Sequence, residues 1–290
     1  MDITQYYQTE NPCYKAGKKI KPSGIVVHST GANNAYIKRY VGPDDGILGV
    51  NQYGNHWNKA SATKCVHAFI GKVADGSVKV YQTLPWDHRC WGVGSGKKGS
   101  YNSTHIQFEI CEDGLTNEAY YNQAFTLAKE LCAFLCALYG ISTDNIVGHY
   151  EAAAAGYGSN HGDPKNWQKK FGGSMAQFRA DVKAMLGQVE SNTTVAKPEA
   201  EPVTEKKETP ASTTTQTASE VISMQTLRKG DKGTQVKVLQ WLLNENGYNA
   251  GTVDGIFGAN TQNAVKAFQK AAGLSVDGVV GKNTWGKLLA

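Results

Sequence analysis

One long polar segment divides this chain more sharply than any other feature of its sequence. Residues 188–223 are rich in Thr, Glu, Lys and Pro and offer almost no side chain that a core could bury. Such a segment cannot bury enough apolar surface to offset the entropy lost when its backbone becomes ordered. We therefore predict a large domain over residues 1–187, a flexible linker over residues 188–223 and a small domain over residues 224–290.

The overall charge is mildly basic, with 30 Lys and Arg against 25 Asp and Glu. A net charge of +5 favours an anionic surface, such as a cell-wall polymer, about as much as it indicates simple solubility. We expect no nucleic-acid partner, and the sequence leaves the oligomeric state open.

The sequence also bears on where the protein is made. No stretch approaches the roughly 20 apolar residues of a membrane span, so we expect no stable membrane insertion. The N-terminus lacks the apolar core of a secretory signal. The six cysteines all precede residue 137 and none forms a Cys-x-x-Cys pair, which favours reduced, structural thiols. We therefore expect synthesis and folding in the cytoplasm.

Short apolar runs bounded by turn residues predict the strands of the large domain. They cover residues 23–28, 66–70, 78–82 and 104–111, and Asp75-Gly76 is a hairpin turn between the second and the third. Helical spacing predicts a long helix over about residues 118–139, which Thr116-Asn117 caps and Gly140 ends. A shorter helix is expected over residues 175–186. This mixture of elements is typical of an α/β domain.

Two histidines and an aspartate are candidate metal ligands. His28 ends the first strand, and His149 and Asp163 lie in the stretch of residues 148–167. Two neutral imidazoles and one carboxylate form the ligand set of a catalytic Zn2+ that keeps one position open for water. His161 could replace Asp163 as the third ligand. We favour Asp163 because the Asp-Pro turn holds a short carboxylate in place.

Further residues fit the other roles that a zinc hydrolase requires. Glu109 lies within the alternating strand over residues 104–111, where a carboxylate is costly unless it is paired or functional, and it is the candidate base. His161 is the candidate donor to an oxyanion. His67 and Trp91 are the candidate substrate-binding residues. His67 could face the site or only pair across the hairpin, and Trp91 lies on a long loop that we interpret as a cleft wall. No His-Glu-x-x-His helix is present.

The small domain contains an internal repeat. Residues 254–261 and 277–284 each have an Asp-Gly turn, a later glycine and then a threonine at the start of a helix. Helical spacing upstream and between the repeats predicts a three-helix bundle. It has no acid–base pair and no ligand cluster, so we interpret it as a binding module, with dimerisation as the alternative.

The large domain resembles the zinc-dependent N-acetylmuramoyl-L-alanine amidases, a family shared with phage endolysins and peptidoglycan recognition proteins. Five pieces occur in the expected order: residues 26–30, 66–70, 106–109, 148–151 and 159–164. Residues 226–287 resemble a small three-helix peptidoglycan-binding domain, through Gly230-Asp231 and the two repeats. The first resemblance implies a mixed central sheet flanked by helices, and the second a small all-α wall-binding domain.

The resemblance also implies roles for individual residues. It places zinc on His28, His149 and Asp163, and it assigns the catalytic positions to Glu109 and His161. Gly92 departs from the pattern, because many relatives have a histidine after the tryptophan that Trp91 matches. One substrate-side contact is therefore expected to differ.

The expected function is hydrolysis of the amide bond between N-acetylmuramic acid and the L-alanine of the stem peptide. A phage or prophage endolysin is the favoured source, made without a signal peptide, released by a holin-type or other non-Sec route and acting on the cell wall. A bacterial autolysin is the second possibility. A zinc peptidase that cuts within the stem peptide and a non-catalytic wall-recognition protein are the alternative functions.

Overall fold

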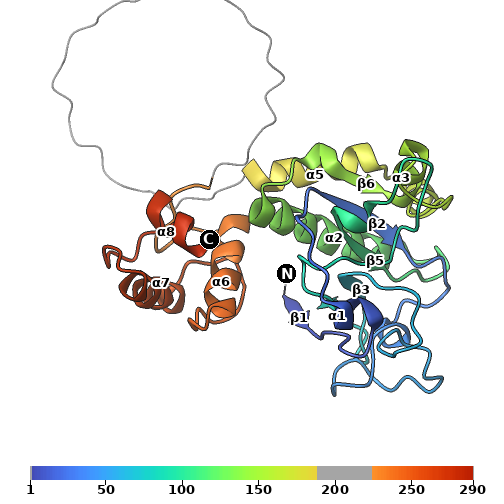
Figure 1. The fold of residues 1–290 in the computed structure, drawn as a ribbon, viewed down its shortest axis with the longest axis horizontal. Coiled ribbons are helices and arrows are strands. Elements are labelled where there is room, and N and C mark those ends of the chain that lie inside the picture. Colours follow the sequence, from blue (N-terminus) through green and yellow to red (C-terminus); the bar gives the residue numbers. More distant parts are fainter. Residues whose placement is uncertain (1, 188–223, 290) are drawn as a thin grey trace, which may run out of the picture.

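The computed structural model describes residues 2–187 and 224–289, so the predicted linker over residues 188–223 lies outside the described residues. Figure 1 shows a larger unit built from strands and helices beside a smaller unit built only from helices. The larger unit is formed by residues 2–187 and the smaller by residues 224–289. This architecture confirms the predicted fold class for both units.

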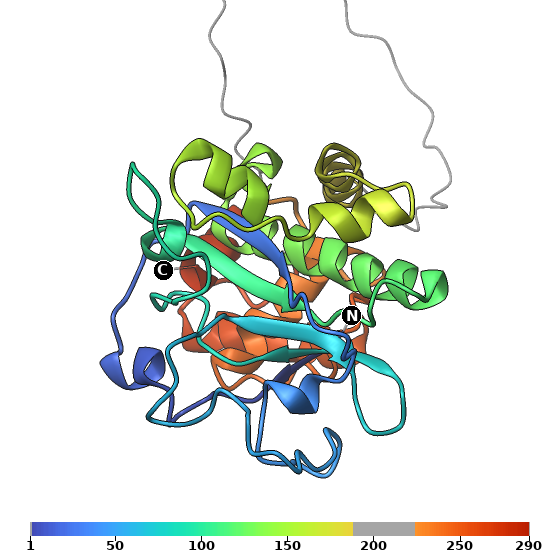
Figure 2. The same ribbon diagram turned by 90° about the vertical axis from the view of Figure 1, so that its right-hand side faces the viewer.

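A six-stranded mixed sheet forms the centre of the larger unit. The strand order is β1-β4-β3-β5-β2-β6, and all neighbouring strands run parallel except the hairpin pair β3 and β4. In Figure 2 the sheet lies in front of the C-terminal helices. The strands are β1 (Ile3–Gln5), β2 (Gly24–Ser29), β3 (Ala68–Lys72), β4 (Val78–Gln82), β5 (His105–Ile110) and β6 (Ile146–Gly148).

The predicted strands occur with small shifts in their boundaries, of which the largest are at the two ends of β3. β3 begins at Ala68, two residues later than expected. Before it, the Val66 carbonyl accepts a hydrogen bond from the Thr83 hydroxyl (2.8 Å). The His67 carbonyl accepts from the backbone of both Thr83 and Leu84. The regular ladder therefore starts only after these irregular bonds.

One long helix packs on one face of the sheet. The Asn117 side chain accepts from the Tyr120 backbone at the start of α2 (Glu118–Tyr139), and Gly140 ends the helix with φ 65°. A left-handed residue after the last turn suits glycine, which has no Cβ. The buried face of α2 packs on the strand residues Ile106 and Phe108. The remaining helices of this unit are α1 (Pro12–Ala16), α3 (His149–Ala155), α4 (Lys165–Lys170) and α5 (Met175–Gly187), with 3-10 turns η1 (Ile37–Arg39), η2 (Tyr101–Ser103) and η3 (Thr143–Asn145).

The opposite face of the sheet carries the loops and α3. Along β2, Ile25 and Val27 point into the core that contains α2, whereas Val26 packs against Val93 and Ala152. Because strand side chains alternate between faces, His28 lies on the same face as Val26. The site described below is therefore built on the face that α2 does not cover.

Three helices form the smaller unit, as predicted: α6 (Thr234–Glu245), α7 (Ala259–Ala271) and α8 (Lys282–Leu288). Its repeat has a matching structure in both copies. Buried Gln240 donates to Asp254 and Thr261 and accepts from the Gly255 backbone. Gln269 makes the same bonds to the second copy, namely with Asp277, Thr284 and Gly278.

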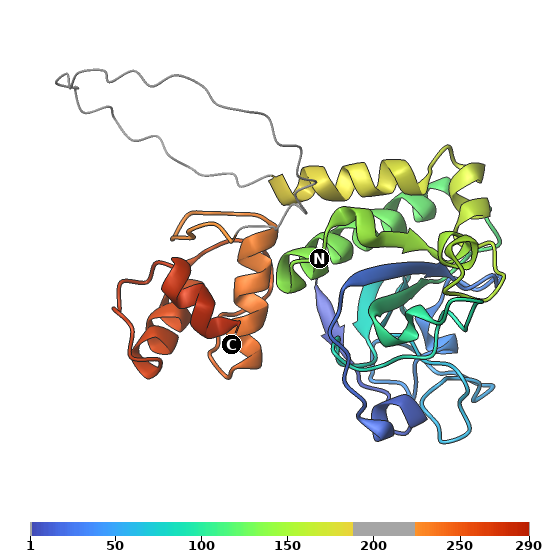
Figure 3. The same cartoon turned by 45° about the horizontal axis from the view of Figure 1, so that its top comes forward.

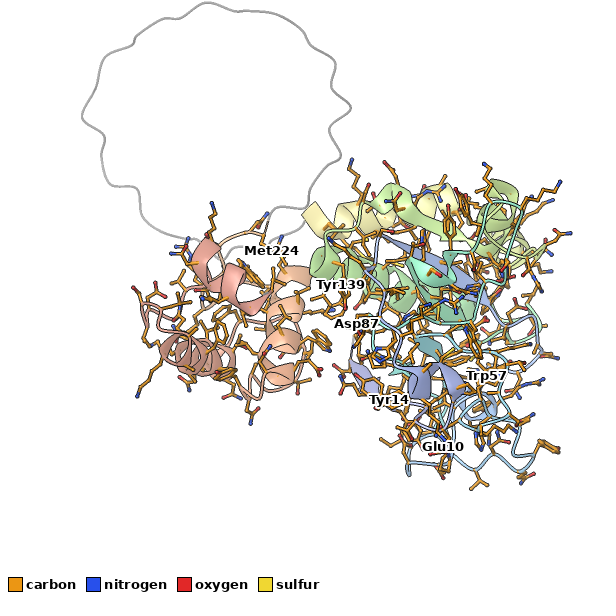
Figure 4. All side chains as sticks on the ribbon, viewed as in Figure 1. Glu10, Tyr14, Trp57, Asp87, Tyr139 and Met224 are labelled. Atoms are coloured by element: carbon orange, nitrogen blue, oxygen red, sulfur yellow. The ribbon has the colours of Figure 1, made fainter. Side chains whose placement is uncertain are left out.

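The smaller unit packs against the larger one through α6 and α2 (Figures 1 and 3). The rings of Phe134 and Trp241 meet edge to face with centroids 5.8 Å apart, and Lys237 Nζ lies 2.8 Å from Glu130 Oε2. In Figure 4, Tyr139 lies next to the C-terminal helices, whereas Trp57 lies on the side turned away from them.

Candidate metal centre

Three parts of the fold meet where the parallel strands β2, β5 and β6 end. His28 lies near the end of β2, and His149 follows β6 directly as the first residue of α3. Asp163 lies in the loop before α4, where its carbonyl accepts from the Tyr150 backbone (3.2 Å). The Ser29 backbone donates to Asp163 Oδ2 (3.3 Å). The carboxyl ends of parallel strands are a common location for binding sites in α/β sheets.

The two imidazoles and the carboxylate point at one another. His28 Nδ1 lies 3.0 Å from His149 Nδ1 and 3.3 Å from Asp163 Oδ2, and His149 Nδ1 lies 3.2 Å from Asp163 Oδ1. Ligand atoms at zinc-binding distances on a tetrahedron are about 3.3 Å apart. Among the residues that the structure describes, this is the only group of three such side chains close enough to share an ion. The geometry therefore fits a tetrahedrally coordinated metal with one open position.

The charge states of these groups also suit a metal. Burial lowers the pKa of His28, which favours the neutral imidazole. Burial alone would raise the pKa of Asp163, but hydrogen bonds and charge from His149 and His28 outweigh burial and hold it well below its usual range. Neutral histidine and ionised carboxylate are the forms that bind metal ions.

Each imidazole is held through its second nitrogen. His28 Nε2 lies 3.1 Å from Gln107 Oε1, and His149 Nε2 lies 3.2 Å from Ser159 Oγ. Such contacts leave the two Nδ1 atoms directed at the site, as in metal centres whose histidines are oriented by outer hydrogen bonds.

Glu109 lies on the floor of the cavity beside this cluster. Its Oε2 atom is shielded from solvent and has no hydrogen-bond partner among the residues that the structure describes. Burial, together with the charges of Asp163 and Glu112, raises the pKa of Glu109 well above its ordinary value, and Lys64 opposes the shift. A buried carboxyl with a raised pKa beside a ligand cluster is typical of a functional acid or base.

The cluster opens into a cavity of about 410 Å³. His161 lies at its exposed rim, with Nδ1 2.9 Å from Ser159 Oγ and its ring stacked on His149 at a centroid distance of 4.6 Å. Trp91 is 37% exposed and lines the wall. Arg39 and Lys64 also line the cavity and make part of it basic.

The structure places His67 away from the cavity. The side chain is fully buried, its Nε2 donates to the His88 carbonyl (2.8 Å), and its Nδ1 accepts from the Gln107 backbone (3.0 Å). Burial lowers its pKa to about 4. Because both nitrogens have protein partners, His67 has no atom to offer a substrate, and we withdraw it as a binding candidate.

Sequence reasoning missed Gln107 and Ser159 as contacts of the histidines. The sequence does contain a pattern that indicates Gln107, because the alternation of residues 104–111 places its side chain on the same face of the strand as Glu109. No such pattern indicates Ser159, because its contact with His149 depends on the path of the loop after α3.

The family model described as N-acetylmuramoyl-L-alanine amidase matches residues 18–166, and a peptidoglycan binding domain model matches residues 232–288. No helix in the described part of the chain is both long and apolar enough to cross a membrane.

Individual relatives match parts of the chain. The N-acetylmuramoyl-L-alanine amidase CwlL of Bacillus licheniformis is 34% identical over 192 residues, which cover 64% of this chain and 45% of CwlL. A spore cortex-lytic enzyme of Bacillus cereus is 43% identical over 65 residues, which cover 22% of this chain and 25% of that enzyme. This chain therefore spans less than half the length of CwlL.

Among solved structures, the Staphylococcus aureus hydrolase AmiA in complex with its ligand is similar at 22% identity and a TM-score of 0.47. The match covers 63% of this chain and 82% of that one. The amidase family model spans about half of the 290 residues. On that match, this chain belongs to the N-acetylmuramoyl-L-alanine amidase family.

Proposed function

We propose that this protein hydrolyses the amide bond between N-acetylmuramic acid and L-alanine in bacterial peptidoglycan. The observation that carries the proposal is the convergence of His28, His149 and Asp163 beside Glu109 in one cavity. Membership of the amidase family supports the choice of bond. The donor set suits Zn2+, and we assign the metal accordingly.

A zinc ion bound there would polarise the amide carbonyl and lower the pKa of a bound water. Glu109 Oε2, which has no hydrogen-bond partner in the described part of the chain, accepts the proton of the attacking water and passes it to the leaving amine. The His161 ring is placed to stabilise the oxygen on which negative charge develops. Trp91 offers an aromatic surface to the substrate at the cavity wall.

The remaining roles concern the cell wall. We propose that residues 224–290 bind peptidoglycan and keep the catalytic domain near its substrate, which raises the local concentration. We further propose that residues 188–223 act as a flexible linker. A phage or prophage endolysin that is made in the cytoplasm and released through a holin-type or other non-Sec route fits this arrangement. A bacterial autolysin is the second candidate.

The test is digestion of purified cell wall with mass spectrometry of the products, before EDTA, after EDTA and after zinc is restored. We expect glycan chains with free muramic acid and stem peptides that begin at L-alanine, lost with EDTA and regained with zinc. Fragments cut within the peptide would instead identify a zinc peptidase. Wall binding without any product would identify a recognition protein.

Two variants separate the roles within the site. Glu109→Gln should retain bound zinc and lose activity by at least about 100-fold, as expected when a general base is removed. Glu118→Gln, at an exposed position at the start of α2, is the matched control and should behave as the unaltered protein. Full activity of the Glu109→Gln variant would refute the assigned mechanism.

A further inference from the structure

A buried asparagine fixes the orientation of polar groups behind the metal centre. Asn102 is 6% exposed, and its Oδ1 atom accepts from the backbone nitrogens of Gly92 and Val93, both at 3.1 Å. Its Nδ2 atom donates to the Gly94 carbonyl at 3.3 Å. Backbone N–H groups only donate and carbonyls only accept, so this amide has a single orientation that satisfies its partners.

The orientation of Asn102 determines that of Gln107. Asn102 Oδ1 lies 3.0 Å from the Gln107 side-chain amide, and because Oδ1 can only accept, the Gln107 nitrogen must face it. Gln107 Oε1 is thereby turned towards His28 Nε2, 3.1 Å away. A carboxamide oxygen also only accepts, so the proton of neutral His28 resides on Nε2. His28 Nδ1 then presents its lone pair to His149 and Asp163.

The surrounding residues hold this chain of groups in place. Gln107 and His67 are fully buried, and His67 both donates to the Gln107 carbonyl (2.7 Å) and accepts from its backbone nitrogen (3.0 Å). At residue 92, a Cβ would lie 2.3 Å from Gln107 Oε1 and 2.9 Å from Val66 Cγ1. Glycine at this position leaves the volume that the Gln107 side chain occupies.

We propose that Gln107, oriented by Asn102, is a positioning residue that selects the metal-binding tautomer of His28 and sets its ring direction. The inference rests on the proposed metal site, and it assigns a cause to the glycine at residue 92. Loss of an outer hydrogen bond to a metal-binding histidine typically weakens metal affinity 10- to 100-fold.

The experiment compares zinc affinity, measured by competition with a chromophoric chelator, in the full-length protein and three variants. Gln107→Met removes the acceptor for His28 and should bind zinc about 10- to 100-fold more weakly. Gln107→Glu keeps an acceptor for His28 but places an oxygen against Asn102, so it should lose stability and retain most of its zinc affinity. Gln82→Met is the matched control, because Gln82 is a buried glutamine on β4 whose side-chain amide, among the described residues, donates to the Leu84 carbonyl alone.

Melting temperatures with and without zinc provide the second readout. A purely structural role predicts that zinc affinity follows the stability of the metal-free protein, so both Gln107 variants and Gln82→Met would be affected alike. A positioning role predicts that affinity follows the presence of an acceptor for His28 and that the zinc-induced rise in melting temperature shrinks only in Gln107→Met. Equal zinc affinity of Gln107→Met and Gln107→Glu would overturn the proposal.

If Gln107→Met does not fold, Gly92→Ala serves as the second variant. Its methyl group displaces Gln107 Oε1 while the amide chemistry stays intact, and it should also weaken zinc binding. Unchanged affinity in Gly92→Ala would overturn the proposal in the same way. If the unaltered protein fails to bind zinc at all, the proposed metal site itself fails, which distinguishes the two cases.

Discussion

His28 and Glu109 lie directly opposite each other on the parallel strands β2 and β5. This pairing places a metal-ligand candidate and the candidate base side by side on the same face of the sheet. A shift of either strand by one residue would turn one of the two side chains to the opposite face. The relationship therefore depends on strand register, which the apolar residues of the two strands fix, and not on a loop.

The first prediction concerns the pH dependence of Glu109. Its pKa is raised above its ordinary value of 4.5, so the folded protein holds this proton at higher pH than the unfolded chain does. The free energy of unfolding contributed by Glu109 therefore decreases as pH rises above about 4.5. Relative to the unaltered metal-free protein, Glu109→Gln should gain stability between about pH 4 and pH 7. Urea unfolding at both pH values tests this, and a constant difference would contradict it.

The second prediction concerns metal removal. An ion that binds only the folded state stabilises it by about 4 kcal/mol when its free concentration is 1,000 times the dissociation constant. Zinc should therefore raise the melting temperature of the unaltered protein and have little effect on His149→Ala or Asp163→Ala. His88→Ala is the control, because His88 lies outside the ligand cluster. A full response to zinc in Asp163→Ala would point to His161 as the third ligand.

The third prediction concerns acid stability. Burial lowers the pKa of His67 to about 4, so its contribution to stability is complete above pH 6.5 and is lost as pH falls towards 4. The full shift corresponds to about 3 kcal/mol. His67→Gln can still donate to the His88 carbonyl but cannot titrate. Unfolding free energies at several pH values should decrease less steeply in this variant, and an unchanged slope would count against the assignment.

The fourth prediction concerns the duplicated turns of the smaller unit. Gln240 and Gln269 each satisfy an Asp-Gly turn and a helix-initiating threonine. Their replacement by alanine leaves buried partners unsatisfied and should cost about 2–3 kcal/mol in either copy. Hydrogen exchange of α6 and α7 in the full-length protein measures the loss. Asn263→Ala, at an exposed position on α7, should have little effect. A much smaller effect at one glutamine would show that the copies are not equivalent.

Local sequence patterns are sufficient to predict many of the helices and strands of this fold. The helix predicted over about residues 118–139 has these bounds in the structure, because polar capping residues and a terminal glycine mark its ends. The alternation of residues 104–111 correctly separated Glu109 from the core-facing Ile106 and Phe108. These features depend on periods of two or 3.6 residues, which can be read from the chain itself.

The environment of His28 was not available from such patterns. Asn102 is oriented by backbone groups of the glycine-rich loop, and no periodicity shows which backbone groups that loop presents. The surroundings of His67 could not be predicted from the sequence either. Its two hydrogen-bond partners lie on β5 and on the loop after β4, so only the folded chain shows that both ring nitrogens are occupied.

The close approach of Gly92 to the Gln107 side chain limits how these two positions can change in evolution. A side chain at residue 92 and an extended glutamine at residue 107 compete for the same volume, so neither position can change without regard to the other. A lineage that acquires a side chain at residue 92 must first shorten or rotate the side chain at residue 107. A lineage that regains an extended glutamine at residue 107 must first return to glycine at residue 92. The two positions are thus expected to covary, although they lie 15 positions apart in the sequence.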